Sequence, residues 1–385
     1  MTFFTRKRSI DGFIYPSLFG ETLNLVNKVK YLGVTLDSKL SWNFHVDNIC
    51  RKATCALFLC RKAIGTTWGL KPCYFKFMYD TIVKPIFYYC SILWWHRADK
   101  KVIMDRLTRV QRLACLMISS CFKSTPTAAL EAFLNIPPLH LSIRAEALLG
   151  YKRLKRLGFW HDGWGHLNIR QAIDCVELDF PEDTITKLIQ VDRRFKTCIE
   201  GPEAAITLHD LSVGSGAILC YTDGSRVSAT GSGAGFCVPC LDMQWFVPLG
   251  CYATVYQAEV LAIHRCVSFL IDKKLNGETI IMFSDSQAAL KSINKYSIRS
   301  GLVSSCVRKL NELGTTNTVK LFWVPGHCGI DGNDEADRLA KNGSNTPFYG
   351  PEPALQVSHS LIRNRVYEFL RWNHQTFWES LNTCR

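Results

Sequence analysis

The sequence predicts a mainly α-helical domain in its N-terminal half and an α/β domain in its C-terminal half, the latter with a mixed five-stranded sheet and flanking helices. A chain of 385 residues is long enough for two cores. Helical periodicity prevails before residue 160, whereas from Ile218 onward three strands precede alternating helices and strands. The charge changes between the halves as well: residues 1–160 hold 25 Lys and Arg against 9 Asp and Glu, and residues 201–385 hold 16 of each.

The basic N-terminal half indicates a polyanionic partner, for which nucleic acid is the usual candidate. The alternative is a helical surface whose cations are only solvated. We expect no membrane partner, because no apolar run approaches the roughly 18 residues of a membrane helix. The 17 cysteines have no paired spacing and predict reduced thiols in an intracellular compartment. Cys237 and Cys240 lack a second ligand pair, so we predict no zinc site there.

In the N-terminal half, a strand is expected over 29–37 and helices over 44–64, 71–95, 102–121 and 126–134. A long basic helix follows Pro137-Pro138 and carries Arg144, Lys152 and Arg156. Several of its cations share one face, which suits a phosphate backbone and equally suits a solvated face. We place a helical basic domain at 41–160 and a linker or connection at 161–215.

The α/β domain is placed at 216–345. Its first strand ends at Asp223, and strands over 233–238 and 244–249 complete an antiparallel meander. Thr254 and Gln257 form a capping box that begins a helix. The remaining expected elements are a strand over 279–283, helices over 286–293 and 302–313, a strand over 319–324 and a helix over 333–342. A tail over 346–385 carries an amphipathic helix at 361–378.

Four acids, Asp223, Glu259, Asp285 and Asp337, fall at strand ends or near helix starts, which meet at one edge of such a sheet. Taken singly, each acid is more often a cap or a solvated turn. Together they would repel one another unless cations lay among them. An all-oxygen ligand set favours Mg²⁺, with Mn²⁺ possible, and two such ions could activate water at a phosphodiester.

His327 follows Pro325-Gly326 in a loop after the last strand, ten residues before Asp337. An imidazole in such a loop could move protons at the phosphate. The alternative is a hydrogen-bonded loop histidine without a role in chemistry.

The C-terminal domain contains five motifs: Thr222-Asp223-Gly224-Ser225, Gln257-Ala258-Glu259, Ser284-Asp285-Ser286-Gln287, Pro325-Gly326-His327 and Gly332 to Lys341. Taken together, they resemble type 1 ribonuclease H. The resemblance implies a metal-dependent endonuclease that hydrolyses the RNA strand of an RNA/DNA hybrid. Asp223, Glu259, Asp285 and Asp337 would be the metal ligands and His327 the proton shuttle. It also implies that Gly224, Ser225 and Gln287 contact the hybrid backbone and the ribose 2′-hydroxyls.

The N-terminal half has a second set of segments: Lys30 to Val34, Leu40 to Trp42, Val83 to Ile86, Trp94-Trp95, Gln111-Arg112, Thr125-Pro126 and Pro137 to Leu139. These segments resemble the region after the polymerase palm of non-LTR retrotransposon reverse transcriptases. It implies a thumb-like domain that grips template and primer, a palm-edge remnant at 1–40, the C-terminal part of a longer polyprotein, and nuclear action. The polymerase Asp-Asp pair does not occur, so the missing palm is an expected partner. Without it, apolar surface is expected to be exposed on the helices that carry Phe75, Phe77, Tyr88, Tyr89, Trp94 and Trp95.

One alternative to the hybrid nuclease is a proofreading-type 3′→5′ exonuclease of similar fold. That class needs a second acid two residues after the first, and Ser225 at this position strongly disfavours it. The other alternative is a catalytically idle, nucleic-acid-binding fragment of a decayed retroelement. If the basic half supplies affinity for the hybrid, cutting the chain near residue 215 should weaken binding and flatten its salt dependence.

Overall fold

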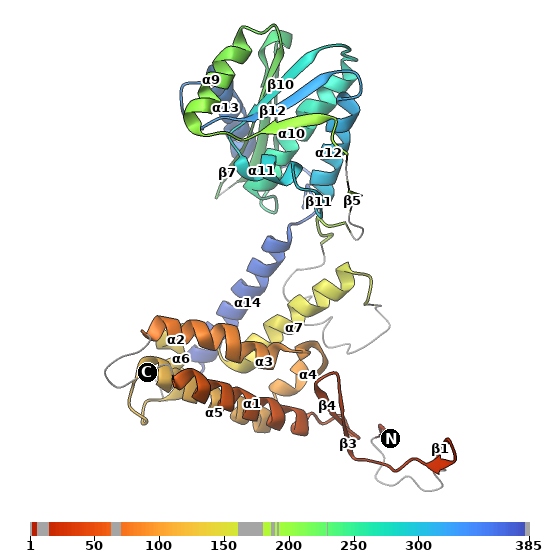
Figure 1. Cartoon of the computed structure of the whole chain (residues 1–385). Coiled ribbons are helices and arrows are strands. Elements are labelled where there is room, and N and C mark those ends of the chain that lie inside the picture. Colours follow the sequence, from red (N-terminus) through yellow and green to blue (C-terminus); the bar gives the residue numbers. More distant parts are fainter. Residues whose placement is uncertain are drawn as a thin grey trace. The chain divides into compact units, whose positions relative to one another are not determined.

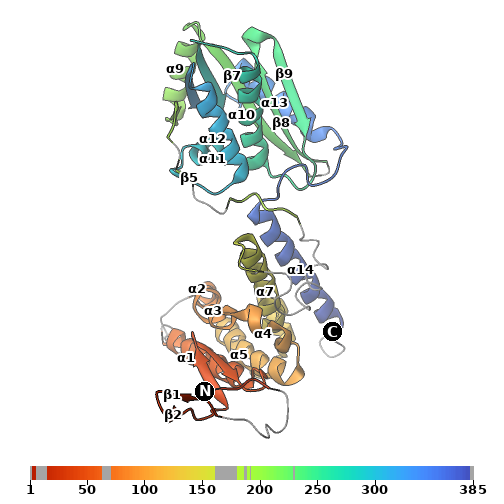
Figure 2. The same ribbon diagram turned by 90° about the vertical axis from the view of Figure 1, so that its right-hand side faces the viewer.

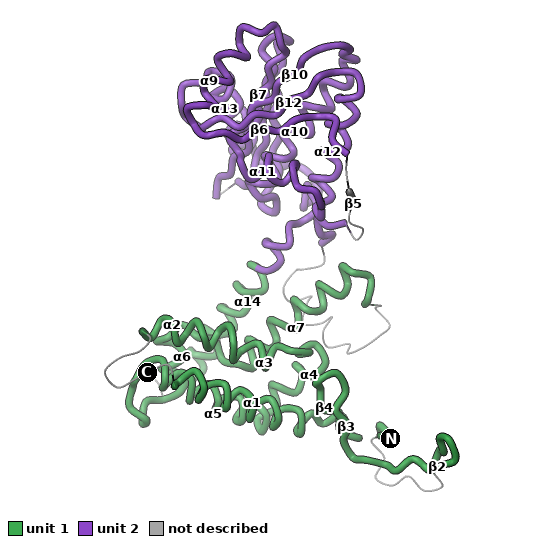
Figure 3. Tube along the Cα trace, in the orientation of Figure 1, with its two compact units in different colours: residues 1–177, 364–385 green, residues 178–363 purple. Residues whose placement is uncertain are grey.

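The computed structural model describes residues 2–5, 15–62, 71–160, 180–185, 189–190, 192–228 and 230–381. The chain divides into two compact units, coloured separately in Figure 3. We call residues 1–177 together with 364–385 the helical unit, and residues 178–363 the sheet unit. Most of the linker expected at 161–215 falls either outside the described residues, at 161–179, or inside the sheet unit.

The helical unit begins with short antiparallel strand pairs and continues as helices (Figures 1 and 2). Its strands are β1 (Ser17–Leu18), β2 (Glu21–Thr22), β3 (Lys28–Tyr31) and β4 (Val34–Asp37). Its helical segments are α1 (Asn43–Arg61), α2 (Pro72–Met78), the π-helical turn η1 (Tyr79–Val83), α3 (Lys84–Tyr88), α4 (Ser91–Ala98), α5 (Lys101–Ser119), α6 (Thr127–Leu134) and α7 (Leu139–Arg156).

The prediction of a single strand over 29–37 is wrong, because the structure has two strands there, β3 and β4. Leu32 and Gly33 have positive φ values of 44° and 82° and turn the chain between β3 and β4. The alternating pattern therefore belongs to a hairpin, and Gly33 supplies the left-handed backbone that the turn requires.

The core of the helical unit follows from the helical spacing of its apolar residues. α1 buries Val46, Ile49, Ala53 and Leu57, which recur every three or four residues and face α5. Of the aromatic residues on the helices expected to expose apolar surface, Phe75, Trp94 and Trp95 are buried, because α2 packs on α5 and α4 on α7. Phe77 and Tyr89 are exposed, as expected.

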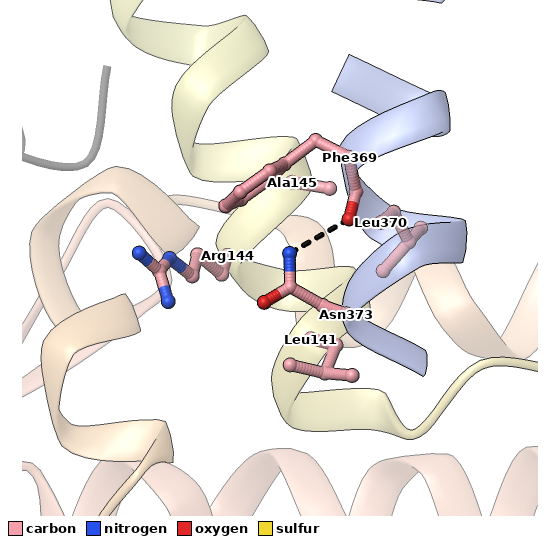
Figure 4. Close-up of a pocket in the computed structure, with 6 residues that line it drawn as sticks. All are labelled: Leu141, Arg144, Ala145, Phe369, Leu370 and Asn373. Atoms are coloured by element: carbon pink, nitrogen blue, oxygen red, sulfur yellow. Dashed lines mark hydrogen bonds between the residues drawn. The ribbon is translucent and has the colours of Figure 1, made fainter. Parts of the chain in front are cut away.

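The tail helix α14 (His359–Glu379) returns to the helical unit from residue 364 onward. Val366 and Leu370 are buried. In Figure 4, Phe369, Leu370 and Asn373 of α14 face Leu141, Arg144 and Ala145 of α7 around a small cavity. The Arg144 guanidinium lies over two rings, 5.6 Å from the centroid of Phe369 and 5.9 Å from that of Trp95. The chain therefore leaves the helical unit after α7 and completes it with α14.

The sheet unit is built on a six-stranded mixed sheet of order β6-β12-β10-β7-β8-β9. The strands β6, β12, β10 and β7 are parallel, and β8 and β9 continue the sheet antiparallel. Their bounds are β6 (Phe195–Cys198), β7 (Ile218–Val227), β8 (Gly231–Val238), β9 (Met243–Pro248), β10 (Thr279–Ser284) and β12 (Thr318–Trp323). A separate short pair joins β5 (Ile189–Gln190) to β11 (Ser297–Ile298).

The predicted α/β class with a mixed sheet is confirmed, with one strand more than the five expected. The additional strand β6 pairs in parallel with β12, Phe195 opposite Val319. Its four residues are too few to show a strand period, and they lie in the stretch expected to be a linker.

Helices cover both faces of the sheet (Figure 2). They are α9 (Pro202–Val213), α10 (Val255–Asp272), α11 (Gln287–Ile293), α12 (Gly301–Leu313) and α13 (Asp331–Asn345), with a 3₁₀ turn η2 at Pro239–Leu241. On one face α10, α11 and α12 bury Val260, Leu290 and Val307 against Ile280 and Met282 of β10. The residue between these two, Ile281, faces the other side and packs with α13. This alternation is that of a strand buried on both faces.

Candidate metal centre

Asp223 lies within β7 rather than at its end. The strand was expected to stop at this residue, but β7 continues to Val227 because its pairing with β8 extends that far. The parallel pairing of β7 with β10 does end beside it, at Thr222 opposite Ser284. Asp223 therefore stands at the edge where the parallel part of the sheet stops, and only 5% of the residue is exposed.

Glu259 is brought to Asp223 by a close approach of strand and helix. The capping box of Thr254 and Gln257 begins α10 as predicted, and Glu259 follows within the helix. A Cβ at Gly224 would lie 2.5 Å from the Glu259 backbone nitrogen, so only glycine permits this contact. Glu259 is 6% exposed, and its Oε2 is buried without a hydrogen-bond partner.

Asp285 follows β10 directly and is half-buried. The loop after β12 lies against it: Trp323 Nε1 donates a hydrogen bond to the Asp285 carbonyl oxygen at 2.9 Å. A Cβ at Gly326 would lie 2.9 Å from Asp285 Oδ2. The Pro-Gly segment thus fits closely around this carboxylate.

The structure brings Asp223, Glu259 and Asp285 together, with one carboxylate oxygen of each within 4.8 Å of the others. Burial, and then the charge of Asp285, raise the pKa of Asp223 to about 7. Burial and the charge of Asp223 hold the pKa of Glu259 well above its usual range, and burial raises the pKa of Asp285. A hydrogen bond from the Gly224 backbone N–H opposes the shifts at Asp223 and Glu259. The three acids therefore repel one another in a poorly solvated place.

Asp337 lies near this group without joining it. It is on α13, and its charge contributes to the raised pKa values of Asp223 and Asp285, so it faces the same edge. Its Oδ2 accepts a hydrogen bond from Lys341 Nζ at 2.6 Å. The described residues thus hold three acids in one cluster and a fourth that is paired with a lysine.

α13 is held close to the sheet by two glycines of β8. A Cβ at Gly233 would lie 2.1 Å from the Ser344 nitrogen, and one at Gly235 would lie 2.5 Å from the Ala340 nitrogen. These contacts fix the distance between α13, which carries Asp337, and the strand next to Asp223.

His327 is exposed in the loop between β12 and α13, where its φ of 56° is left-handed. Its ring lies within electrostatic reach of Asp285 and opposes the rise in the pKa of that acid. The exposed ring is open to solvent at the edge of the acidic cluster.

The residues expected to contact nucleic acid have different surroundings. Gly224 is buried against α10, and Ser225 is half-buried in β7. Gln287 begins α11, and its Oε1 accepts a hydrogen bond from Lys291 Nζ at 2.8 Å. Sequence reasoning gave Lys341 no role, although its position four residues after Asp337 on a helix was the signal that could have found it.

Comparisons with known proteins match the part of the chain that carries this site. The family model described as RNase H matches residues 215–345. The chain is 26% identical over 140 residues to a 115 kDa protein in the type-1 retrotransposable element R1DM of Drosophila melanogaster, covering 36% of this chain and 13% of that protein. It is 23% identical over 113 residues to a retrovirus-related Pol polyprotein from the type-1 retrotransposable element R1 3 of Nasonia vitripennis, covering 29% of this chain and 30% of that protein.

Residues 215–345 therefore form an RNase H domain, which defines the class of the site as that of a nucleic-acid hydrolase. The chain is a homologue of R1 non-LTR retrotransposon polyproteins. The matched stretches span less than a third of either relative. No helix of the described residues has the length and apolar character that a bilayer span requires.

Proposed function

We propose that the RNase H domain of this chain is a type 1, divalent-metal-dependent endonuclease that hydrolyses the RNA strand of RNA/DNA hybrids. We propose in addition that it acts as the C-terminal part of a retrotransposon polyprotein. The basic helical unit would bind the template–primer nucleic acid, and a polymerase palm would be a partner.

The observation that carries this proposal is the buried, unpartnered Oε2 of Glu259 beside Asp223 and Asp285. Buried polar atoms nearly always have a hydrogen-bond partner or a ligand. Burying three acids with no basic side chain paired to them in the described residues is costly, and a cation removes that cost. The donor set fits a hard cation, because it consists of carboxylate oxygens alone.

Asp223, Glu259 and Asp285 would hold one ion, and Asp337 would join Asp223 at a second. Mg²⁺ is the proposed metal, and Mn²⁺ would substitute for it. When bound, the ions would supply an activated water and stabilise the charge on the leaving 3′ oxygen. His327, exposed beside Asp285, would carry protons between solvent and the reacting phosphate.

The backbone at Gly224, the Ser225 hydroxyl and the Gln287 amide are proposed to contact the hybrid. Ser225 lies two residues along the same strand from Asp223, and Gln287 lies two residues after Asp285, so both border the acidic cluster. A hydroxyl and an amide can hydrogen-bond to a ribose 2′-hydroxyl, the group that distinguishes RNA from DNA.

The test is cleavage of an end-labelled RNA/DNA hybrid by the purified chain with Mg²⁺ and with EDTA. We expect cleavage of the RNA strand in Mg²⁺ alone, with 5′-phosphate products and with single-stranded RNA and duplex DNA left intact. Asp223→Asn and Asp285→Asn should abolish cleavage, whereas Asp242→Asn, in an exposed turn, should not. Normal cleavage by either site variant would sink the assignment.

The second candidate is a catalytically idle fragment that binds nucleic acid. It is favoured by the surplus of 16 basic residues over acidic ones in residues 1–160, which needs no active nuclease. In the same assay it predicts hybrid binding without cleavage in either Mg²⁺ or Mn²⁺.

A further inference from the structure

Lys341 is bound to a carboxylate of the proposed metal centre. Its Nζ lies 2.6 Å from Asp337 Oδ2, one helical turn away on α13. About half of the lysine side chain is exposed, and that of Asp337 is 22% exposed. The ion pair therefore places one positive charge at the acidic edge, directly on the carboxylate of Asp337.

The four acids thus differ in how their charge is balanced. In the described part of the chain, no Lys or Arg forms an ion pair with Asp223, Glu259 or Asp285, whereas Asp337 has Lys341. A divalent ion can enter the three-acid cluster without displacing any side chain. An ion that engages Asp337 has to share or replace the ammonium of Lys341.

We propose that Lys341 is an internal counter-ion that takes the place of a divalent cation at Asp337 and yields it only when such a cation binds there. This inference rests on the metal centre proposed above. At its second position, Asp337, the Lys341 ammonium and a metal ion would exchange with each other. Lys341 is then a positioning residue that sets the affinity of the second ion.

The exchange has a consequence for substrate binding. Once Asp337 binds a metal ion, the released ammonium remains within one helical turn of it on α13. A phosphate oxygen of the nucleic acid is then the natural partner for this flexible cation. Lys341 would change its partner from carboxylate to phosphate as the site fills.

The experiment titrates Mn²⁺ into the full chain and measures free Mn²⁺ by electron paramagnetic resonance. Lys341→Met removes the counter-ion from a half-exposed position that tolerates an apolar chain. Arg338→Met is the matched control, because it removes one cation of the same helix, paired to Glu335 at 2.6 Å. Lys341→Arg keeps the charge. We expect the second Mn²⁺ to bind about two- to fivefold tighter in Lys341→Met, the range of an exposed ion pair, with the first ion unchanged.

Arg338→Met and Lys341→Arg should bind the second ion as the wild type does. In saturating Mg²⁺, Lys341→Met should also raise the KM for the hybrid more than it lowers kcat. Equal affinity for the second ion in Lys341→Met and the wild type would overturn the inference, and so would equal tightening in Arg338→Met. If either of these results is obtained with protein that binds two Mn²⁺ ions, the inference about Lys341 fails while the proposed nuclease stands. Wild-type protein that binds no Mn²⁺ would instead sink the metal centre itself.

Discussion

Replacing Asp223 with asparagine should have opposite effects on stability with and without metal. The pKa of Asp223 rises from its ordinary value of 3.8 to about 7 in the folded chain, because the residue is buried and lies near the charge of Asp285. The shift of about 3 pKa units corresponds to about 4 kcal/mol at 1.36 kcal/mol per unit. That amount is the expected destabilisation of the metal-free sheet unit when Asp223 is ionised.

The sign follows from proton linkage. Because the folded pKa is the higher one, the folded state binds more protons than the unfolded state between pH 3.8 and about 7. Protonated Asp223 therefore contributes its full share to the free energy of unfolding below pH 3.8, and this contribution is lost as the pH rises through about 7. In EDTA at pH 8, Asp223→Asn should be more stable than the wild type by up to about 4 kcal/mol. In saturating Mg²⁺ the order should reverse, because the wild type alone gains the binding energy of the ion.

The measurement is hydrogen exchange of peptides from β7 and β10, which reports the opening of the sheet unit within the full chain. Asp242→Asn serves as the control, since Asp242 is exposed in a turn. The reasoning is refuted if Asp223→Asn is less stable than the wild type in EDTA at pH 8. It is refuted equally if both proteins lose the same stability between pH 4 and 8.

Three further substitutions test how the site is held. Gly235→Ala places a Cβ 2.5 Å from the Ala340 nitrogen and should cost the sheet unit about 1–3 kcal/mol in hydrogen exchange. Gly214→Ala, with open space around it and a φ of −87°, should not. His327→Ala should slow hybrid cleavage by about 10²-fold and change its pH profile while the fold persists, and an unchanged rate and profile would exclude a proton-transfer role. Leu370→Ala should cost the helical unit about 2–5 kcal/mol and leave exchange in the sheet unit unaltered.

Local signals in the sequence were enough for the elements that carry the acids. The capping box of Thr254 and Gln257 lies within four residues, and its prediction is confirmed by both hydrogen bonds. The apolar run before Asp285 is buried on both faces, which fixes its place inside the sheet. In each case the information that determines the structure lies next to the residue it positions.

Contacts distant in sequence were not predictable in this way. The strand β6 depends on pairing with β12, more than 100 residues later, and its own four residues carry no period. The continuation of β7 past Asp223 depends on β8. The pairing of Asp337 with Lys341 is unpredictable for another reason: the pattern of acids marks metal ligands, whereas the metal-free chain satisfies one of these acids with its own lysine.

The boundary between the units changes how the role of the basic half should be tested. A cut near residue 215 would remove β6 and α9 from the sheet unit, so weaker binding after such a cut could reflect a damaged nuclease. A fragment of residues 178–363 keeps both elements. It also leaves out residues 1–160 with their surplus of 16 positive charges.

We expect this fragment to cleave hybrids in Mg²⁺ and to bind them more weakly, with a shallower dependence of log Kd on log salt. The slope should fall by about 0.9 for each phosphate that the helical unit neutralises in the full chain. Binding by fluorescence anisotropy from 50 to 300 mM KCl measures both slopes, and cleavage by the fragment shows that its site is intact. Equal slopes for fragment and full chain would mean that the cations of the helical unit face solvent rather than nucleic acid.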